Sequence, residues 1–111
     1  IDMKVLRADE VNEKANGTHY QDCMSVSYFK LIELFGLPTF GKRSADNKVL
    51  SEWIIEGDDG KIATIYDYKS GEWDVEFVTR WHLGGNDDSY WLINQIKEKV
   101  NKSVDTHNLE C

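Results

Sequence analysis

The chain has few cysteines and no long hydrophobic run, and each shortage excludes a class of protein. Its 111 residues include only two cysteines, Cys23 and Cys111, with no CxxC pair and no Cys/His cluster at zinc-finger spacing. Small secreted domains usually carry more disulfides, so this count favours a reducing compartment. No apolar stretch approaches the ~20 residues of a membrane-spanning helix, and the start IDMKVL holds no signal-peptide core.

Basic residues are also scarce. Thirteen Lys and Arg face twenty Asp and Glu, which gives a formal net charge of −7. Such a surface repels a phosphate backbone, so we expect no direct nucleic-acid binding. An acidic surface suits solubility, which needs no partner, but it also suits a basic protein partner or mimicry of a nucleic acid.

The length and the 41% hydrophobic content fit one domain with a modest core. We expect that domain to span residues 1–103, with a flexible tail at 104–111, where no pattern is present. Met3 is the expected native start, and residues 109–111 read as a cloning remnant.

Two segments show helical spacing, 28–35 and 89–102. In the first, apolar residues recur at i, i+3, i+4 and i+7. Ser25 or Ser27 can cap its start, and Gly36 followed by Pro38, the only proline, ends it. A third, shorter helix is expected at 9–15.

Three strands are expected after the first helix. Residues 48–56 and 61–68 are rich in β-branched and aromatic residues, and the Asp-Asp-Gly between them predicts a hairpin turn. Residues 72–83 alternate between an apolar face and a polar face. The expected apolar face is Trp73, Val75, Phe77, Trp81 and Leu83. We therefore predict an α+β fold, a three-stranded antiparallel sheet packed against two helices, with a short N-terminal segment.

The stretch WHLGGNDDS allows two interpretations. Gly84 and Gly85 precede a helix, where free N–H groups attract anions, and His82 lies beside them. A ligand could bind at His82, Gly84 and Gly85 with stacking from Trp53 or Tyr66. However, the glycine spacing matches no phosphate-binding motif, and Asp87 and Asp88 can satisfy those N–H groups themselves. The sequence thus favours a simple strand-to-helix turn.

No catalytic constellation is evident. His19 and His82 could form an acid–base pair, but nothing in the sequence brings them together. Cys23 lies before a helix without a nucleophile motif and is expected to be buried and inert. Acidic residues at 58, 59 and 67 lack EF-hand spacing. We expect no enzyme activity, no catalytic residue, no metal and no cofactor.

The polar side of the predicted sheet is a better candidate for binding a protein. Tyr and Arg are common in interface hot spots, and both occur there. The candidate partner-binding residues are Arg80, His82, Asp74, Glu76, Tyr66 and Tyr68.

Four motifs resemble a family of small, uncharacterised proteins encoded by bacteriophages. They are FGLPT at 35–39, SEW at 51–53, DDGKIATIYDYK at 58–69 and WHLGG at 81–85, in the family's order. The resemblance covers about two thirds of the chain. The family usually has Thr, Val and Ile where Lys61, Ile62 and Leu83 stand here. The resemblance implies a phage gene expressed in the bacterial cytoplasm, and it carries no activity or catalytic residue with it.

Together these features predict a non-enzymatic phage accessory protein that binds and inhibits a host or bacterial-defence protein. An anti-CRISPR-like or nucleic-acid-mimicking inhibitor is an example, and its partner could have a basic nucleic-acid groove. The alternative is a protein that sequesters a small ligand or nucleotide. The two exposed edges of a three-stranded sheet also allow a homodimer.

Overall fold

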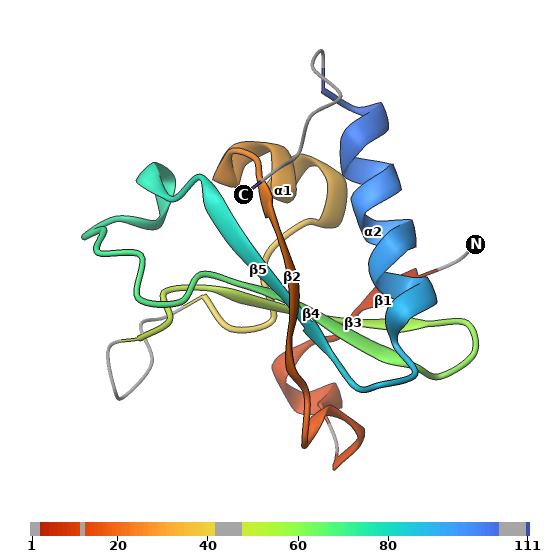
Figure 1. Cartoon of the computed structure of the whole chain (residues 1–111). Helices are drawn as coiled ribbons and strands as arrows, with labels where there is room; N and C mark the ends of the chain where they lie inside the picture. The colour runs from red at the N-terminus through yellow and green to blue at the C-terminus, as the bar shows by residue number, and fades with distance from the viewer. Residues whose placement is uncertain (1–2, 12, 42–47, 105–110) are drawn as a thin grey trace.

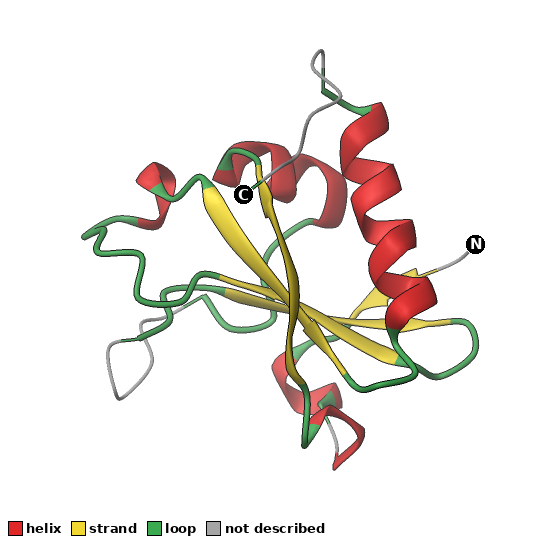
Figure 2. Ribbon diagram, viewed as in Figure 1, coloured by secondary structure: helices red, strands yellow, loops and turns green. Residues whose placement is uncertain are grey.

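The computed structural model describes residues 3–11, 13–41, 48–104 and 111, and in them two α-helices lie on one antiparallel sheet (Figures 1 and 2). The helices are α1 (Tyr28–Phe35) and α2 (Tyr90–Lys102). The strands are β1 (Met3–Val5), β2 (His19–Ser25), β3 (Glu52–Gly57), β4 (Ile62–Tyr66) and β5 (Arg80–Gly85), in the spatial order β1-β3-β4-β5-β2. The α+β class is confirmed, but the sheet has five strands rather than the predicted three.

The two unpredicted strands, β1 and β2, form the edges of the sheet. Strand β1 has only three residues, too few to show alternation. In β2, a register shift between Tyr20 and Asp22 interrupts the pairing with β5. Because a bulge inserts a residue and breaks the period of two, the alternation in sequence is lost. Asp22 binds Lys97 of α2 at 2.8 Å and so ties this edge to the helix.

The predicted hairpin is confirmed. Strands β3 and β4 pair antiparallel, and the N–H of Gly57 donates to the carbonyl of Lys61 across the turn at 2.9 Å. Gly60 has φ of +82°, a conformation that glycine adopts without strain. Both strands are shorter than the sequence suggested, because the chain leaves the sheet before Glu52 and after Tyr66.

Helix α1 begins and ends where the sequence placed it. The hydroxyl of Ser27 accepts a hydrogen bond from the N–H of Lys30 at 3.1 Å, and Gly36 follows the last turn with φ of +78°. In α2, Leu92, Ile93, Ile96 and Val100 are buried, whereas Tyr90 is exposed. Neither helix is long and apolar enough to cross a bilayer within the described ranges.

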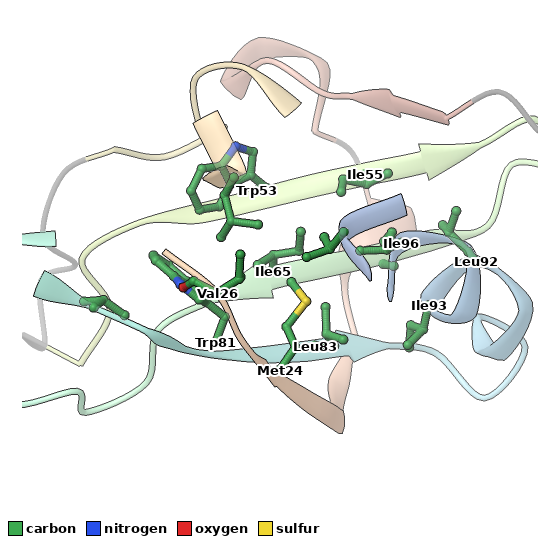
Figure 3. Close-up of a cluster of buried hydrophobic side chains, with 14 of the residues drawn as sticks. Met24, Val26, Trp53, Ile55, Ile65, Trp81, Leu83, Leu92, Ile93 and Ile96 are labelled. Atoms are coloured by element: carbon green, nitrogen blue, oxygen red, sulfur yellow. The ribbon is translucent and has the colours of Figure 1, made fainter. Parts of the chain in front are cut away.

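The main core lies between the helices and one face of the sheet (Figure 3). Trp53 and Trp81 are fully buried there, with ring centroids 5.4 Å apart. Each indole N–H finds a backbone carbonyl at 3.0 Å, that of Gly36 for Trp53 and that of Val26 for Trp81. Burying both polar groups with partners avoids an unmatched donor in the core.

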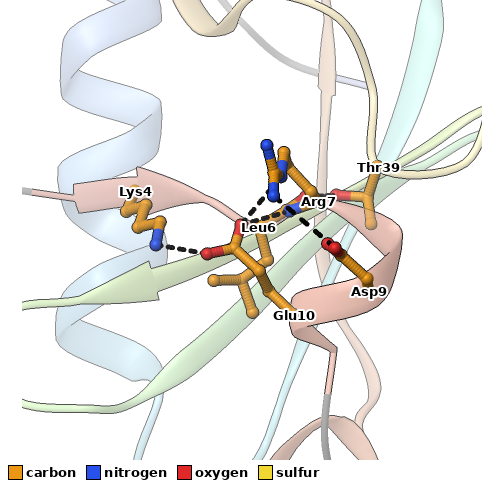
Figure 4. Close-up of polar contacts among 6 residues, drawn as sticks. All are labelled: Lys4, Leu6, Arg7, Asp9, Glu10 and Thr39. Carbon is orange, nitrogen blue, oxygen red and sulfur yellow. Dashed lines mark hydrogen bonds and ion pairs between the residues drawn. The ribbon is translucent and has the colours of Figure 1, made fainter.

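The N-terminal segment covers part of the opposite face of the sheet. Two 3-10 turns replace the single helix expected at 9–15, at Ala8–Glu10 and Glu13–Ala15. Leu6 packs on Ile54 and Ile62, and its carbonyl accepts from the Thr39 hydroxyl at 2.7 Å. Lys4 and Arg7 hold Glu10 beneath β1 (Figure 4). None of the described helices or turns covers the rest of this face, beside β2 and β5.

The prediction of a strand over 72–83 is wrong in its first half. Strand β5 starts at Arg80, and the residues before it form a loop with a 3-10 turn at Val75–Phe77. The carboxylate of Asp74 accepts from the N–H of Glu76 at 3.1 Å, a local hydrogen bond that competes with strand pairing. Trp73 and Phe77, expected in the core, are 88% and 66% exposed.

Cys23 and Cys111 form a disulfide, which the cysteine count did not predict and which is unusual in the reducing compartment that the count favoured. Cys23 is buried in the edge strand β2, as expected, but it is not a free thiol. The bond joins the last residue of the chain to β2, 88 residues earlier. The expected flexible tail falls largely at 105–110, outside the described residues.

Candidate functional site: a tyrosine-lined cavity around His82

The uncovered half of the sheet face is built from two rows of paired residues. In the first row, Tyr66 of β4, His82 of β5 and Cys23 of β2 are direct neighbours. In the second row, Gly84 lies between Thr64 of β4 and Tyr20 of β2. Since neighbours in register share a face, Tyr20, Tyr66 and His82 point to the same side of the sheet, away from the helices.

These residues line a shallow pocket of about 400 Å³ that is open to solvent, here named the His82 cavity. Its walls are Tyr20, Tyr66, Tyr68, Arg80 and His82. The centroid of the His82 ring lies 5.0, 5.4 and 6.0 Å from those of Tyr20, Tyr66 and Tyr68. The rings meet at angles of 45–64°, in tilted and edge-to-face contacts that aromatic pairs favour.

Burial and neighbouring charge shift the ionisation of the walls. Burial, and then the Arg80 guanidinium, lower the pKa of His82 below its ordinary 6.5, while the Asp67 carboxylate opposes the shift. Burial, and then the Glu52 carboxylate, raise the pKa of Tyr66. Both shifts favour uncharged rings at neutral pH, so the guanidinium is the charged group of the cavity wall.

Among the residues that the structure describes, the polar ends of these five side chains find no partner. Within the described ranges, no phenol hydroxyl of the three tyrosines, no nitrogen of the His82 ring and no guanidinium nitrogen of Arg80 makes a hydrogen bond or ion pair. A ligand entering the cavity would therefore find donors that are not engaged elsewhere.

The glycines of the WHLGG stretch have a structural role. A Cβ on Gly84 would lie 2.8 Å from the Thr64 hydroxyl and 3.2 Å from the Tyr66 ring, and a Cβ on Gly85 would lie 2.6 Å from the Cβ of Ser89. Both glycines are buried beneath side chains. They let the tyrosine wall and the helix start approach β5, and their backbone offers no surface to a ligand.

The start of α2 differs from the prediction that Asp87 and Asp88 satisfy its N–H groups. Asp88 instead binds Lys61 across the hairpin at 2.7 Å, and Asp87 contacts His19 at 3.5 Å. The Ser89 hydroxyl accepts from the N–H of Asn86 at 3.0 Å and donates to the carbonyl of Ile62. This buried serine fixes the turn, which supports the strand-to-helix interpretation.

The other sequence candidates lie away from the cavity. Trp53 is fully buried on the helix-covered face, so it cannot stack on a ligand there. His19 pairs with Gly85, three positions along β5 from His82 and therefore on the opposite face, so the two histidines do not converge. Asp67 is buried, and its carboxylate accepts from the N–H groups of Leu50 and Ser51.

The partner-binding candidates divide between two places. Tyr66, Tyr68, Arg80 and His82 come together around the cavity, whereas Asp74 and Glu76 belong to the loop before β5. We name the exposed part of that loop the 72–77 surface; it consists of Glu72, Trp73, Asp74, Glu76 and Phe77. A hollow of about 220 Å³, lined by Glu72, Phe77 and His82 among others, connects it to the cavity.

Sequence reasoning missed two features of the site, Tyr20 and the exposure of the 72–77 surface. Tyr20 was missed because the bulge in β2 concealed the strand that carries it. The local signal that could have revealed the loop is Asp74, whose side chain favours a turn.

Comparison of the chain with protein-family models, curated proteins and solved structures gives no match. Function must therefore be argued from the site itself.

Proposed function

We propose that this protein is a non-enzymatic accessory protein of a bacteriophage that acts in the bacterial cytoplasm by binding and inhibiting a host or bacterial-defence protein. The observation that carries the proposal is the 72–77 surface. Its two large aromatic side chains, Trp73 and Phe77, are mostly exposed, although burying each would be strongly favourable. Exposed aromatic groups of this kind mark protein interaction sites.

The chemistry of the surface suggests the kind of partner. Three carboxylates, those of Glu72, Asp74 and Glu76, alternate with apolar residues, two of them aromatic, and no basic residue occurs between 71 and 77. Together with the net charge of −7, this pattern is complementary to a basic, partly apolar groove. A nucleic-acid-binding groove of a host or defence protein has that character. The motifs shared with phage proteins give the cellular setting.

The test is affinity capture from bacterial lysate at low and moderate salt. We expect the wild-type chain to retain one partner at near-stoichiometric level, with weaker retention as salt screens the carboxylates. The double variant Trp73→Ala/Phe77→Ala should lose it, and Asp74→Lys/Glu76→Lys should weaken it. The matched control is Tyr90→Ala/Trp91→Ala, which removes two exposed aromatic rings from α2. No stoichiometric partner at either salt concentration, or equal loss in the control, would contradict the proposal.

The homodimer stays a prediction. The described edges of the sheet are β1 and β2, and either could pair with a second copy. Sedimentation of the purified protein would decide between monomer and dimer.

A further inference from the structure

The His82 cavity differs in chemistry from the 72–77 surface beside it. The loop carries carboxylates, whereas the cavity wall contains a guanidinium, three phenols and an imidazole. A volume of about 400 Å³ lies within the range of small-molecule sites. We therefore expect the cavity to bind a different molecule from the protein partner of the 72–77 surface.

Charge favours an anionic group in that occupant. Arg80 can only donate hydrogen bonds, and no carboxylate among the described residues pairs with it. A second cation lies next to one wall residue: the Nζ of Lys69 is 5.4 Å from the centroid of the Tyr68 ring. Two carboxyl groups lie near the cavity. Glu52 is the neighbour of Tyr66 on β3 and shares its face of the sheet, but burial raises the pKa of Glu52 and so disfavours its negative charge. The carboxylate of Asp67 accepts backbone N–H groups.

The rings favour a planar group. Tyr20 and Tyr68 remain 50% and 41% exposed, so both can offer a ring to a ligand. Stacking of a heterocyclic base on an aromatic side chain is tolerant of the base's identity, because every base has a π-face. Phosphate, like carboxylate, is an anion that guanidinium groups bind in bidentate geometry, and in a nucleotide it is attached to the heterocyclic base through the sugar.

We propose that the His82 cavity binds a nucleoside monophosphate, with the base against Tyr20 or Tyr68 and the phosphate at Arg80. A single nucleotide is favoured over a strand, because the chain's net charge of −7 would repel the additional phosphates of a polynucleotide. The site differs from the one expected at the glycine turn: it uses His82 together with the tyrosines and Arg80, and excludes Gly84, Gly85 and Trp53. It does not depend on the protein partner proposed above.

The test uses the purified full chain, so it is independent of capture from lysate. AMP, GMP, CMP and UMP are titrated by calorimetry, alongside the matching nucleosides and inorganic phosphate. We expect at least one monophosphate to bind saturably, at least tenfold more tightly than its nucleoside and than phosphate alone. Arg80→Gln should weaken binding at least tenfold, Arg80→Lys less, and Tyr68→Ala at least tenfold.

Matched controls are Tyr90→Ala and Lys102→Gln on α2, an exposed ring and an exposed cation far along the chain from the cavity. Both should bind as the wild type does. Circular dichroism establishes that each variant is folded. Absence of saturable binding at millimolar concentration for all four monophosphates, or binding unchanged by Arg80→Gln and Tyr68→Ala, would overturn the proposal. Loss of partner capture with intact nucleotide binding would contradict only the proposed function.

Discussion

His82 meets Tyr20 edge to face, with ring centroids 5.0 Å apart, although 61 other residues separate them in sequence. The contact forms because the bulged strand β2 pairs with β5 at the edge of the sheet. It places an imidazole among three phenols and beside a guanidinium, in a cavity whose polar groups bind no other described residue. The properties of this arrangement can be measured directly.

The ionisation of His82 should depend on Arg80. In the folded chain the pKa of His82 lies below 6.5, because burial and then the adjacent guanidinium disfavour the imidazolium. An NMR titration should give a midpoint below 6.5 for His82, and Arg80→Gln should raise it. A midpoint at or above 6.5 in the wild type would contradict the assignment.

The same shift predicts how stability depends on pH. As pH falls below 6.5, His82 takes up a proton more readily in the unfolded chain than in the folded chain, because its pKa is lower in the folded chain. The stability contributed by the neutral ring is therefore present above pH 6.5 and is lost as pH falls from 6.5 through the pKa of His82 in the folded chain. Urea unfolding from pH 7.5 down to 5 should show this loss. His82→Gln should reduce the dependence of the unfolding free energy on pH in this range. If that dependence is unchanged in the variant, it arises from other titratable groups.

Gly84→Ala should destabilise the fold by about 1–3 kcal/mol, because an added methyl group would crowd the Thr64 hydroxyl, the carbonyl of His19 and the Tyr66 ring. Chemical denaturation measures the effect. Gly41→Ala is the control, since a Cβ there would meet only Pro38 at an ordinary 3.5 Å. Equal stability of the two variants would show that β5 tolerates a side chain beneath the cavity.

Two tryptophans that the sequence placed on one face should behave oppositely. Trp81→Ala should cost about 3–5 kcal/mol, because the ring is fully buried against Trp53. Trp73→Ala should change stability by no more than about 0.5 kcal/mol, since its side chain is largely exposed. If Trp73→Ala destabilised the protein as much as Trp81→Ala, Trp73 would be buried, as the predicted strand over 72–83 requires.

Reduction of the disulfide between Cys23 and Cys111 should lower stability by about 4 kcal/mol, as expected when a loop of this length is opened in the unfolded chain. Denaturation with and without reductant measures the difference. Cys111→Ser should match the reduced wild type and should not respond to reductant. Alkylation of both thiols in unreduced, denatured protein would show that the bond does not form.

The elements that could be predicted from the sequence are those whose structure is determined by residues close to them in the chain. Helix α1 was predicted closely because Ser27 and Gly36 act on their own neighbours, and the β3–β4 hairpin because its turn chemistry is local. Strand β2 is held by pairing with a distant partner across a bulge, so its own residues show no period. In the loop before β5, apolar and polar residues alternate without a sheet, because the turn at Asp74 determines the backbone.

The site followed the same division. Tyr66, Arg80 and His82 were identified because their strands were recognised, whereas Tyr20 came from the strand that was not. The ligand interpretation joined His82 to Gly84, Gly85 and Trp53, none of which lies on the wall of the His82 cavity. It took glycines for a backbone binding loop where they make room for side chains.

The strand order also determines when the protein can fold during synthesis. Strands β3, β4 and β5 are consecutive neighbours in the sheet, but β1 and β2 precede all of them in the chain. On the ribosome, β2 emerges long before β5, with which it pairs. The backbone N–H and C=O groups of β2 therefore lack their partners in β5 while the intervening 54 residues are synthesised. The nascent chain can complete the sheet only after Gly85 has left the exit tunnel, and α2, synthesised last, then closes the core over it.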